Sequence, residues 1–164
     1  MAPACGQVAL MTSNYLRLRF QDDGDGTGKL IARAEADGYS GEGGAYFNID
    51  TLEEFAKAIG AFPLPSSDER RSITGGFGKK DGDGDWEHEH LGISVYPADA
   101  LRGYIGIQVR MATEVWQATR PESQKIARIE VVTTYEPLSR FSRDLLSLLN
   151  GTIKEALLEG QSIA

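Results

Sequence analysis

The sequence contains few of the residue types that catalytic and metal sites use most often. Its 164 residues include one cysteine, Cys5, and two histidines, His88 and His90. A single cysteine cannot form an internal disulfide, which favours a reducing compartment. Neither a Cys-His nor a Ser-His-Asp arrangement can be proposed from spacing, because both histidines lie in one polar, acidic stretch. We therefore predict no catalytic residue and expect a function other than catalysis.

Long hydrophobic runs and positive charge are also scarce. No apolar run approaches the roughly 20 residues that span a bilayer, and residues 1–15 lack the pattern of a secretion signal. A cytoplasmic location is expected. The net charge of −7, from 17 basic and 24 acidic residues, disfavours nucleic acids and anionic membranes as partners. It suits a basic protein partner, although an acidic balance that only maintains solubility explains it equally well.

What is present is the composition of a globular protein. Hydrophobic residues make up 41% of the chain and charged residues 25%, which is ordinary for a folded domain. A chain of this length buries roughly 70% of its unfolded surface and can form a substantial core. The 19 glycines cluster between apolar runs, which indicates turns and many hairpins. Residues 1–164 are therefore predicted to form a single α+β domain.

Alternation of apolar and polar residues predicts the strands. Such runs occur near residues 16–20, 29–37, 46–49, 72–77, 91–95, 105–111 and 127–133. The glycine-rich segments 21–28 and 38–44 are predicted to be loops between them. Together these runs predict an antiparallel sheet of about six or seven strands.

Two apolar stripes at helical spacing predict the main helices, near residues 50–61 and 137–149, packed on the sheet. Phe55 and Phe141 lie at the centres of the two stripes and are expected to be buried anchors. Both helices contain a Leu-x-x-Phe motif after a strand. This echo suggests a weak internal repeat of residues 14–62 and 103–149, unless Leu-x-x-Phe simply reflects how an amphipathic helix packs on a sheet.

A third, shorter helix is predicted at the C-terminal end of the sequence. Thr152 and Glu155 have the spacing of a capping box, in which the two side chains cap the first turn of a helix. The apolar residues that follow would form this helix, which would end near Gly160.

Two acidic, glycine-rich loops and the histidine pair were considered as metal sites. An EF-hand requires a glutamate at position 12, and the loops that start at Asp23 and Asp81 have alanine and glycine there. Hairpin turns are favoured instead. On a strand, His88 and His90 would share a face and could reach one metal ion, but no third ligand is evident. No cofactor is predicted, and a metal-dependent enzyme that uses His88 and His90 is kept as a third hypothesis.

Negative charge is concentrated in residues 81–90, called the acidic segment below, which contain five acidic residues and no basic one. An aromatic anchor with an acidic rim suits a basic protein partner. A solvated face is the alternative. If residues 22–25 lay at the same end of the sheet, they would enlarge one acidic patch around the tryptophan. The predicted partner-binding residues are Asp81, Asp83, Asp85, Trp86, Glu87 and Glu89.

Three short motifs carry a family resemblance: Tyr39-Ser40-Gly41, Tyr46-Phe47 and Leu52-Glu53-Glu54-Phe55. With the layout of residues 14–149, this part of the chain resembles the WapI-type immunity proteins of bacterial toxin–immunity systems. The resemblance implies a protein that binds and inhibits a cognate toxin, often a nuclease, and a basic toxin would suit the acidic chain. The alternative is a secretion-type chaperone that binds an extended segment of an effector.

Overall fold

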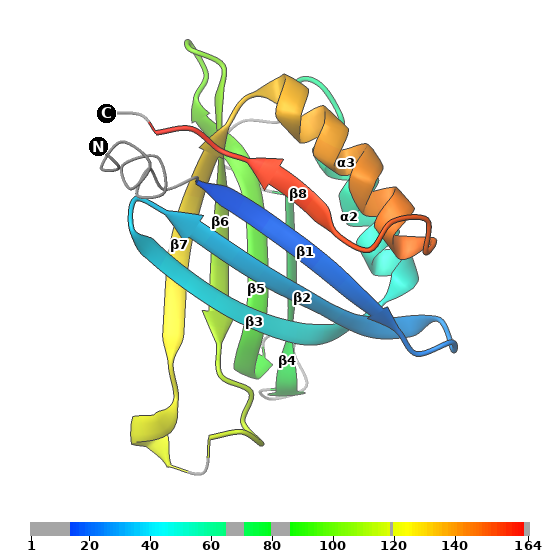
Figure 1. Cartoon of the computed structure of the whole chain (residues 1–164), viewed down its shortest axis with the longest axis vertical. Coiled ribbons are helices and arrows are strands. Elements are labelled where there is room, and N and C mark those ends of the chain that lie inside the picture. Colours follow the sequence, from blue (N-terminus) through cyan, green and yellow to red (C-terminus); the bar gives the residue numbers. More distant parts are fainter. Residues whose placement is uncertain (1–13, 65–70, 80–85, 119, 163–164) are drawn as a thin grey trace, which may run out of the picture.

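The computed structural model describes residues 14–64, 71–79, 86–118 and 120–162, which form two antiparallel sheets of four strands each and two main helices (Figure 1). The first sheet has the order β3-β2-β1-β8 and consists of β1 (Tyr15–Asp22), β2 (Thr27–Ala36), β3 (Tyr39–Asn48) and β8 (Ala156–Glu159). The second has the order β4-β5-β6-β7 and consists of β4 (Arg71–Lys79), β5 (Trp86–Asp99), β6 (Tyr104–Ala112) and β7 (Ile126–Thr133).

The prediction of α+β architecture is confirmed, but the prediction of one sheet with six or seven strands is wrong. In Figure 1 the strands of the second sheet cross behind those of the first, and the two sheets share one apolar core. Alternation of side chains identifies a strand and its buried face, but it carries no information on the sheet to which the strand belongs. Here a helix separates β3 from β4 along the chain, and β4 pairs with β5 instead of β3.

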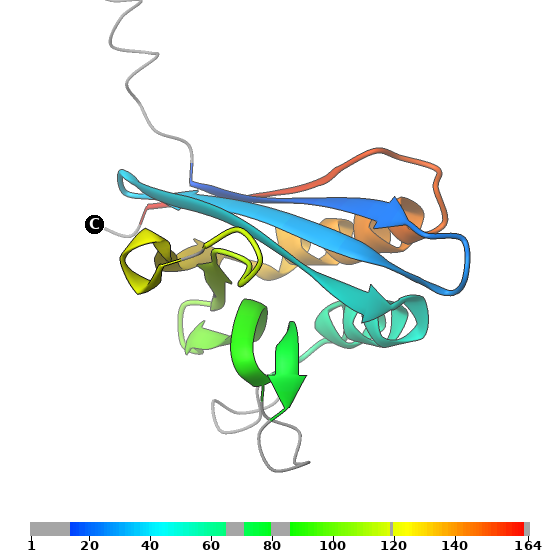
Figure 2. The ribbon, with the colours of Figure 1, turned by 90° about the horizontal axis from the view of Figure 1, so that it is seen from below.

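The helices α2 (Ile49–Ile59) and α3 (Tyr135–Leu149) confirm the two predicted helical stripes. Figure 2 shows the first sheet as one layer, with the second sheet and the helices sharing its other side. Phe55 and Phe141 are buried, at 5% and 2% exposure, as expected. The helices contact each other closely, because the Ser142 hydroxyl donates a hydrogen bond to the Ala56 carbonyl at 2.6 Å. Neither helix of the described ranges is long and apolar enough to cross a membrane.

The first acidic loop is a hairpin turn, as favoured from the sequence. Residues 23–26 connect β1 to β2, and Gly24 and Gly26 adopt positive φ angles of 81° and 90°. The Asp22 and Asp25 carboxylates accept hydrogen bonds from the Gly24 and Thr27 amides. Aspartate and glycine therefore serve the backbone geometry of the turn.

The predicted loop at residues 38–44 is wrong, because β3 already begins at Tyr39. Only Asp37 and Gly38, with φ angles of 53° and 89°, form the turn from β2. The glycines that follow allow the second sheet to approach closely. A Cβ atom on Gly43 would lie 2.9 Å from the Met111 Cβ, and one on Gly41 would lie 2.7 Å from the Ala127 Cβ. These glycines therefore reflect packing between sheets.

The predicted last helix is also wrong, because Ala156–Glu159 forms the strand β8. It pairs with β1 in the register Leu16↔Leu158. Ala156 and Leu158 are buried while Leu157 and Glu159 are exposed, which is the period of a strand. The backbone hydrogen bonds offered by β1, together with this alternation, outweigh the local capping pattern. The internal repeat of residues 14–62 and 103–149 stays a prediction.

Candidate binding surface

The acidic segment lies only partly within the described residues. Asp81, Asp83 and Asp85 fall outside them, whereas Trp86, Glu87 and Glu89 begin β5. Trp86 is half-buried and Glu87 is exposed. Among these described members of the segment, Glu87 is therefore the acidic side chain best placed to meet a partner.

Glu89 has a structural role that the sequence did not indicate. The Arg110 guanidinium on the neighbouring strand β6 lies 3.3 Å from the Glu89 carboxylate and donates a hydrogen bond of 2.8 Å to its backbone carbonyl. The Glu89 side chain is 29% exposed. It is therefore a member of a cross-strand pair and only a marginal part of any partner contact.

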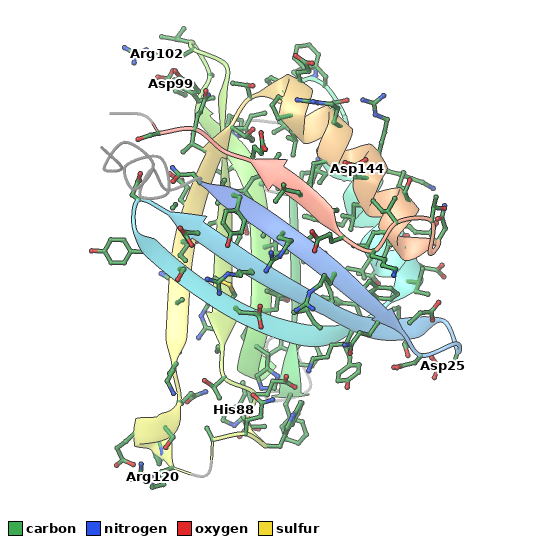
Figure 3. The ribbon with its side chains drawn as sticks, viewed as in Figure 1. Asp25, His88, Asp99, Arg102, Arg120 and Asp144 are labelled. Atoms are coloured by element: carbon green, nitrogen blue, oxygen red, sulfur yellow. The ribbon has the colours of Figure 1, made fainter. Side chains whose placement is uncertain are left out.

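The described part of the acidic segment lies apart from the acidic turn at residues 22–25. Asp25 lies at the tip of the β1–β2 hairpin, and His88 near the start of β5 lies at a different corner of the molecule (Figure 3). The candidate surface consequently consists of the start of β5 and its neighbours, without residues 22–25.

A β-bulge places His90 inside the protein. Gly75 of β4 pairs with Leu91 and Gly76 pairs with Glu89, so that His90 has no residue opposite it. His90 and Leu91 are consecutive and both buried, at 1% and 0% exposure. Such bulges redirect a side chain, often beside a functional site. His88, in contrast, is half-buried, and its ring lies 3.7 Å from the Glu87 carboxylate.

The His90 ring contacts two consecutive residues of the connection between β6 and β7, residues 113–125. Its Nε2 atom accepts a hydrogen bond from the Val115 amide at 3.3 Å, and its ring lies edge to face with Trp116 at a centroid distance of 5.1 Å. Burial lowers the pKa of His90, Glu114 opposes this effect, and His88 and Lys29 add to it. The imidazole is therefore neutral at neutral pH, with its proton on Nδ1.

An ion pair joins the same connection to the first sheet. The Lys29 ammonium of β2 donates a hydrogen bond of 2.6 Å to Glu114 Oε1, and their side chains are only 19% and 8% exposed. The lysine side chain passes over Gly44 of the edge strand β3, where a Cβ atom would lie 3.0 Å from Lys29 Cε. The other carboxylate oxygen, Glu114 Oε2, is buried and has no hydrogen-bond partner among the described residues.

Two exposed aromatic side chains, Phe77 of β4 and Trp116 of the β6–β7 connection, meet beside His90. Each is 54% exposed, and their rings lie edge to face at a centroid distance of 6.1 Å. We call Phe77 and Trp116 the aromatic pair. Next to it is a cavity of about 250 Å³ lined by His88, Val115, Ala118, Arg120, Pro121 and Gln124, and Figure 3 shows His88 and Arg120 at this same end.

Sequence reasoning missed most of this surface. The sequence pattern identifies Phe77 only as part of a strand, and Trp116 and Glu114 belong to no periodic pattern. The one available signal was a tryptophan in a polar connection, where packing does not explain its presence. The contacts that hold it come from β4 and β5, far from it in the sequence.

The structure offers no further support for a metal centre. Among the described residues no group of three or more histidine, cysteine, aspartate and glutamate side chains is placed to hold a metal ion. His90 Nε2, the atom that would bind a metal, already accepts the Val115 hydrogen bond. The hypothesis of an enzyme based on His88 and His90 therefore gains nothing from this geometry.

A larger cavity, of about 410 Å³, lies elsewhere, between the β2–β3 turn and β7. Its polar residues Asn14 and Asp37 bond to each other, because the Asp37 amide donates to Asn14 Oδ1 at 3.1 Å. The Asn14 amide in turn donates to the Asp37 carboxylate at 3.4 Å. These groups stabilise the turn, and the surface around the aromatic pair is the better candidate site.

Comparison with known proteins adds no family to this geometry. No protein-family model matches the chain. The searches of curated proteins and of solved structures likewise find no significant match.

Proposed function

We propose that the protein acts by binding another protein, and that the contact is made by the aromatic pair together with the start of β5. The observation that carries this proposal is the exposure of Phe77 and Trp116, each 54%, in one edge-to-face pair. Aromatic side chains, tryptophan above all, are enriched among the residues that dominate binding energy. The contacts of Trp116 with His90 and Phe77 hold it in place before binding, which reduces the entropy lost in the complex.

The partner that suits this surface is basic. The acidic segment overlaps the first residues of β5, where Glu87 is exposed. Opposite charges accelerate the encounter of two proteins and orient them, while the aromatic anchors supply affinity. The net charge of −7 acts in the same direction over longer distances.

The proposed partner is a cognate toxin, which the protein would bind and inhibit as an immunity protein does. The resemblance of residues 39–55 to WapI-type immunity proteins supports this identity of the partner. A toxin that acts on nucleic acid must itself be basic to bind its substrate, which agrees with the acidic surface. Inhibition of this kind needs no catalytic group, because occupying the toxin's surface is sufficient.

The experiment is a binding measurement between the purified protein and the toxin encoded next to its gene. Replacing both Phe77 and Trp116 by alanine is expected to weaken binding at least roughly 30-fold, or about 2 kcal/mol, as for other central aromatic anchors. The matched control is Tyr39→Ala, which removes an aromatic side chain that is 76% exposed at the start of β3. It should leave the affinity nearly unchanged.

Two outcomes would contradict the proposal. Equal losses in the double variant and the control would show that the aromatic pair is not the centre of the contact. Binding to an extended segment of a secreted effector, with none to the toxin, would favour the chaperone hypothesis instead.

A further inference from the structure

His90 lies between two elements that the sequence separates, the bulge of β5 and the β6–β7 connection. Its ring supports Trp116 directly, at a centroid distance of 5.1 Å, and its Nε2 atom holds the backbone of the preceding residue Val115. The base of the connection is closed separately, by hydrogen bonds between Thr113 and Lys125. The position of Trp116 within the connection therefore depends on His90.

The hydrogen bond to Val115 exists only while the imidazole is neutral. A backbone amide can only donate, so Nε2 must offer a lone pair to it. Protonation places a hydrogen on Nε2, and two donors would then face each other at 3.3 Å. Water cannot compensate, because His90 is only 1% exposed. A buried donor without an acceptor is costly, so either the ring or residues 115–116 must move.

The same connection carries a buried acceptor oxygen without a partner. Glu114 Oε2 is buried without a hydrogen-bond partner among the described residues, and Glu114 directly precedes Val115. The carboxylate of Glu114 favours the imidazolium, whereas the charges of His88 and Lys29 oppose it. The neutral ring is bonded to the Val115 amide, and a protonated ring would have to move toward the Glu114 carboxylate to find an acceptor.

We infer that His90 is a proton-operated switch that presents Trp116 for binding when it is neutral and releases residues 115–116 when it is protonated. The movement itself is a property of the free protein. Its consequence for a partner, weaker binding in mild acid, rests on the proposed function. Because burial lowers the pKa of His90, the switch operates below the usual histidine range of about 6.5.

The chain has only two histidines and two tryptophans, so the signals of His90 and Trp116 can be separated from the others with one substitution each. In a Trp86→Phe background, the fluorescence of Trp116 and its quenching by acrylamide are followed during acid titration. The protonation of His90 is followed by NMR of the ring carbons, with His88→Gln to assign the signals. We expect Trp116 to become more accessible with the same midpoint as the His90 titration, below about pH 6.5, while the Val115 amide signal shifts as it loses its acceptor.

The decisive variant is His90→Gln, because a glutamine amide oxygen offers an acceptor near Nε2 but does not titrate in this range. It should abolish the fluorescence transition, whereas His88→Gln should retain it. If His90→Gln does not fold, the comparison of the Trp116 and His90 midpoints still tests the switch, because it is made in protein that retains His90. A transition that survives in His90→Gln, midpoints that differ, or loss of far-UV circular dichroism at the same midpoint would each overturn the switch.

A second arm connects the switch to the proposed function. Affinity for the toxin should fall through the same midpoint in the wild-type protein and stay constant with pH in His90→Gln. Absence of toxin binding at every pH would count against the proposed function alone, since the fluorescence and NMR arm uses no partner. Binding that is independent of pH while Trp116 moves would overturn the regulatory consequence.

Discussion

His90 illustrates how one buried residue can link stability to pH. Its folded-state pKa is lowered, first by burial, so the unfolded chain binds its proton more readily than the native state. The stability that comes from neutral His90 is present above the unfolded pKa of about 6.5 and is lost as pH falls through the lower folded pKa. Removal of the titrating group should therefore flatten this part of the stability profile.

We predict that the free energy of unfolding decreases between about pH 7 and pH 5 in the wild-type protein and decreases less in His90→Gln. His88 is half-buried, and His88→Gln is the matched control that should retain most of the decrease, since burial is the first cause of the lowered His90 pKa. Urea denaturation at several pH values measures the difference. The Thr27 hydrogen bonds hold the pKa of the exposed Asp25 carboxylate below the usual range of aspartate, so this group titrates below the pH window of His90. Identical profiles for wild type and His90→Gln would contradict the prediction.

Phe55 and Phe141 are the central apolar side chains of the two helices. At 5% and 2% exposure, each should lose roughly 3–5 kcal/mol of stability on replacement by alanine, because burial is lost and a cavity remains. Phe62→Ala is the control, since Phe62 is 75% exposed and its replacement removes an edge-to-face contact with Tyr135. Its cost should stay below about 1.5 kcal/mol. Chemical denaturation measures the loss in free energy of unfolding for each variant. A loss below about 1 kcal/mol for Phe55→Ala or Phe141→Ala would contradict the prediction.

At the scale of elements, β8 shows how a strand can follow a helical capping pattern. Its residues alternate between the core and solvent, and its backbone completes the first sheet beside β1. The same four residues in a helix would place consecutive side chains at about 100° to one another. Alternating exposure of successive side chains in Ala156–Glu159 therefore distinguishes a strand from a helix.

Two leucine variants of β8 test this strand. Leu158→Ala, at a position 1% exposed, should destabilise the protein by roughly 2–5 kcal/mol. Leu157→Ala, one residue earlier and 46% exposed, should cost less than about 1 kcal/mol. Thermal or urea unfolding of the two variants gives the comparison. Similar losses at both positions would show that the segment is not an edge strand with alternating faces.

For the molecule as a whole, the second sheet and the two helices share one side of the first sheet (Figures 1 and 2). The Lys29–Glu114 ion pair joins the β6–β7 connection, which carries Trp116, to the first sheet. Breaking a buried pair leaves an uncompensated charge, so this ion pair resists displacement of the connection, while His90 holds it to the second sheet. The surface around Trp116 is thus a product of how the sheets pack.

Reversal of charge in the acidic segment tests its part in the proposed encounter. Replacing Asp83, Asp85 and Glu87 by lysine should slow association with the toxin and weaken the salt dependence of that rate. Stability should change little at Glu87, which is exposed, because exposed charges contribute little to folding. The control replaces three exposed acids elsewhere, Asp23, Glu54 and Asp144, and changes the net charge equally. Stopped-flow kinetics in which both variants slow alike would show that only the net charge matters.

The sequence by itself determined the class of the fold, most strands, both main helices and their buried phenylalanines. These features depend on side-chain periodicity within a few residues, which local sequence records directly. Sequence patterns led to wrong predictions for the glycines of β3 and for β8, because the residues that pack or pair with these segments are distant along the chain. Gly43 is explained by Met111 of the opposite sheet, and Leu158 by Leu16.

Only the tertiary structure decided where the candidate site lies. Lys29 and Glu114 are 85 residues apart along the chain, yet they form one ion pair. His90 faces inward because a bulge interrupts the period of its strand, and an interruption of this kind depends on the partner strand. The aromatic pair likewise joins β4 to a connection beyond β6. Contacts of this range are set by strand order and by the packing of one sheet on another, and neither leaves a local pattern in the sequence.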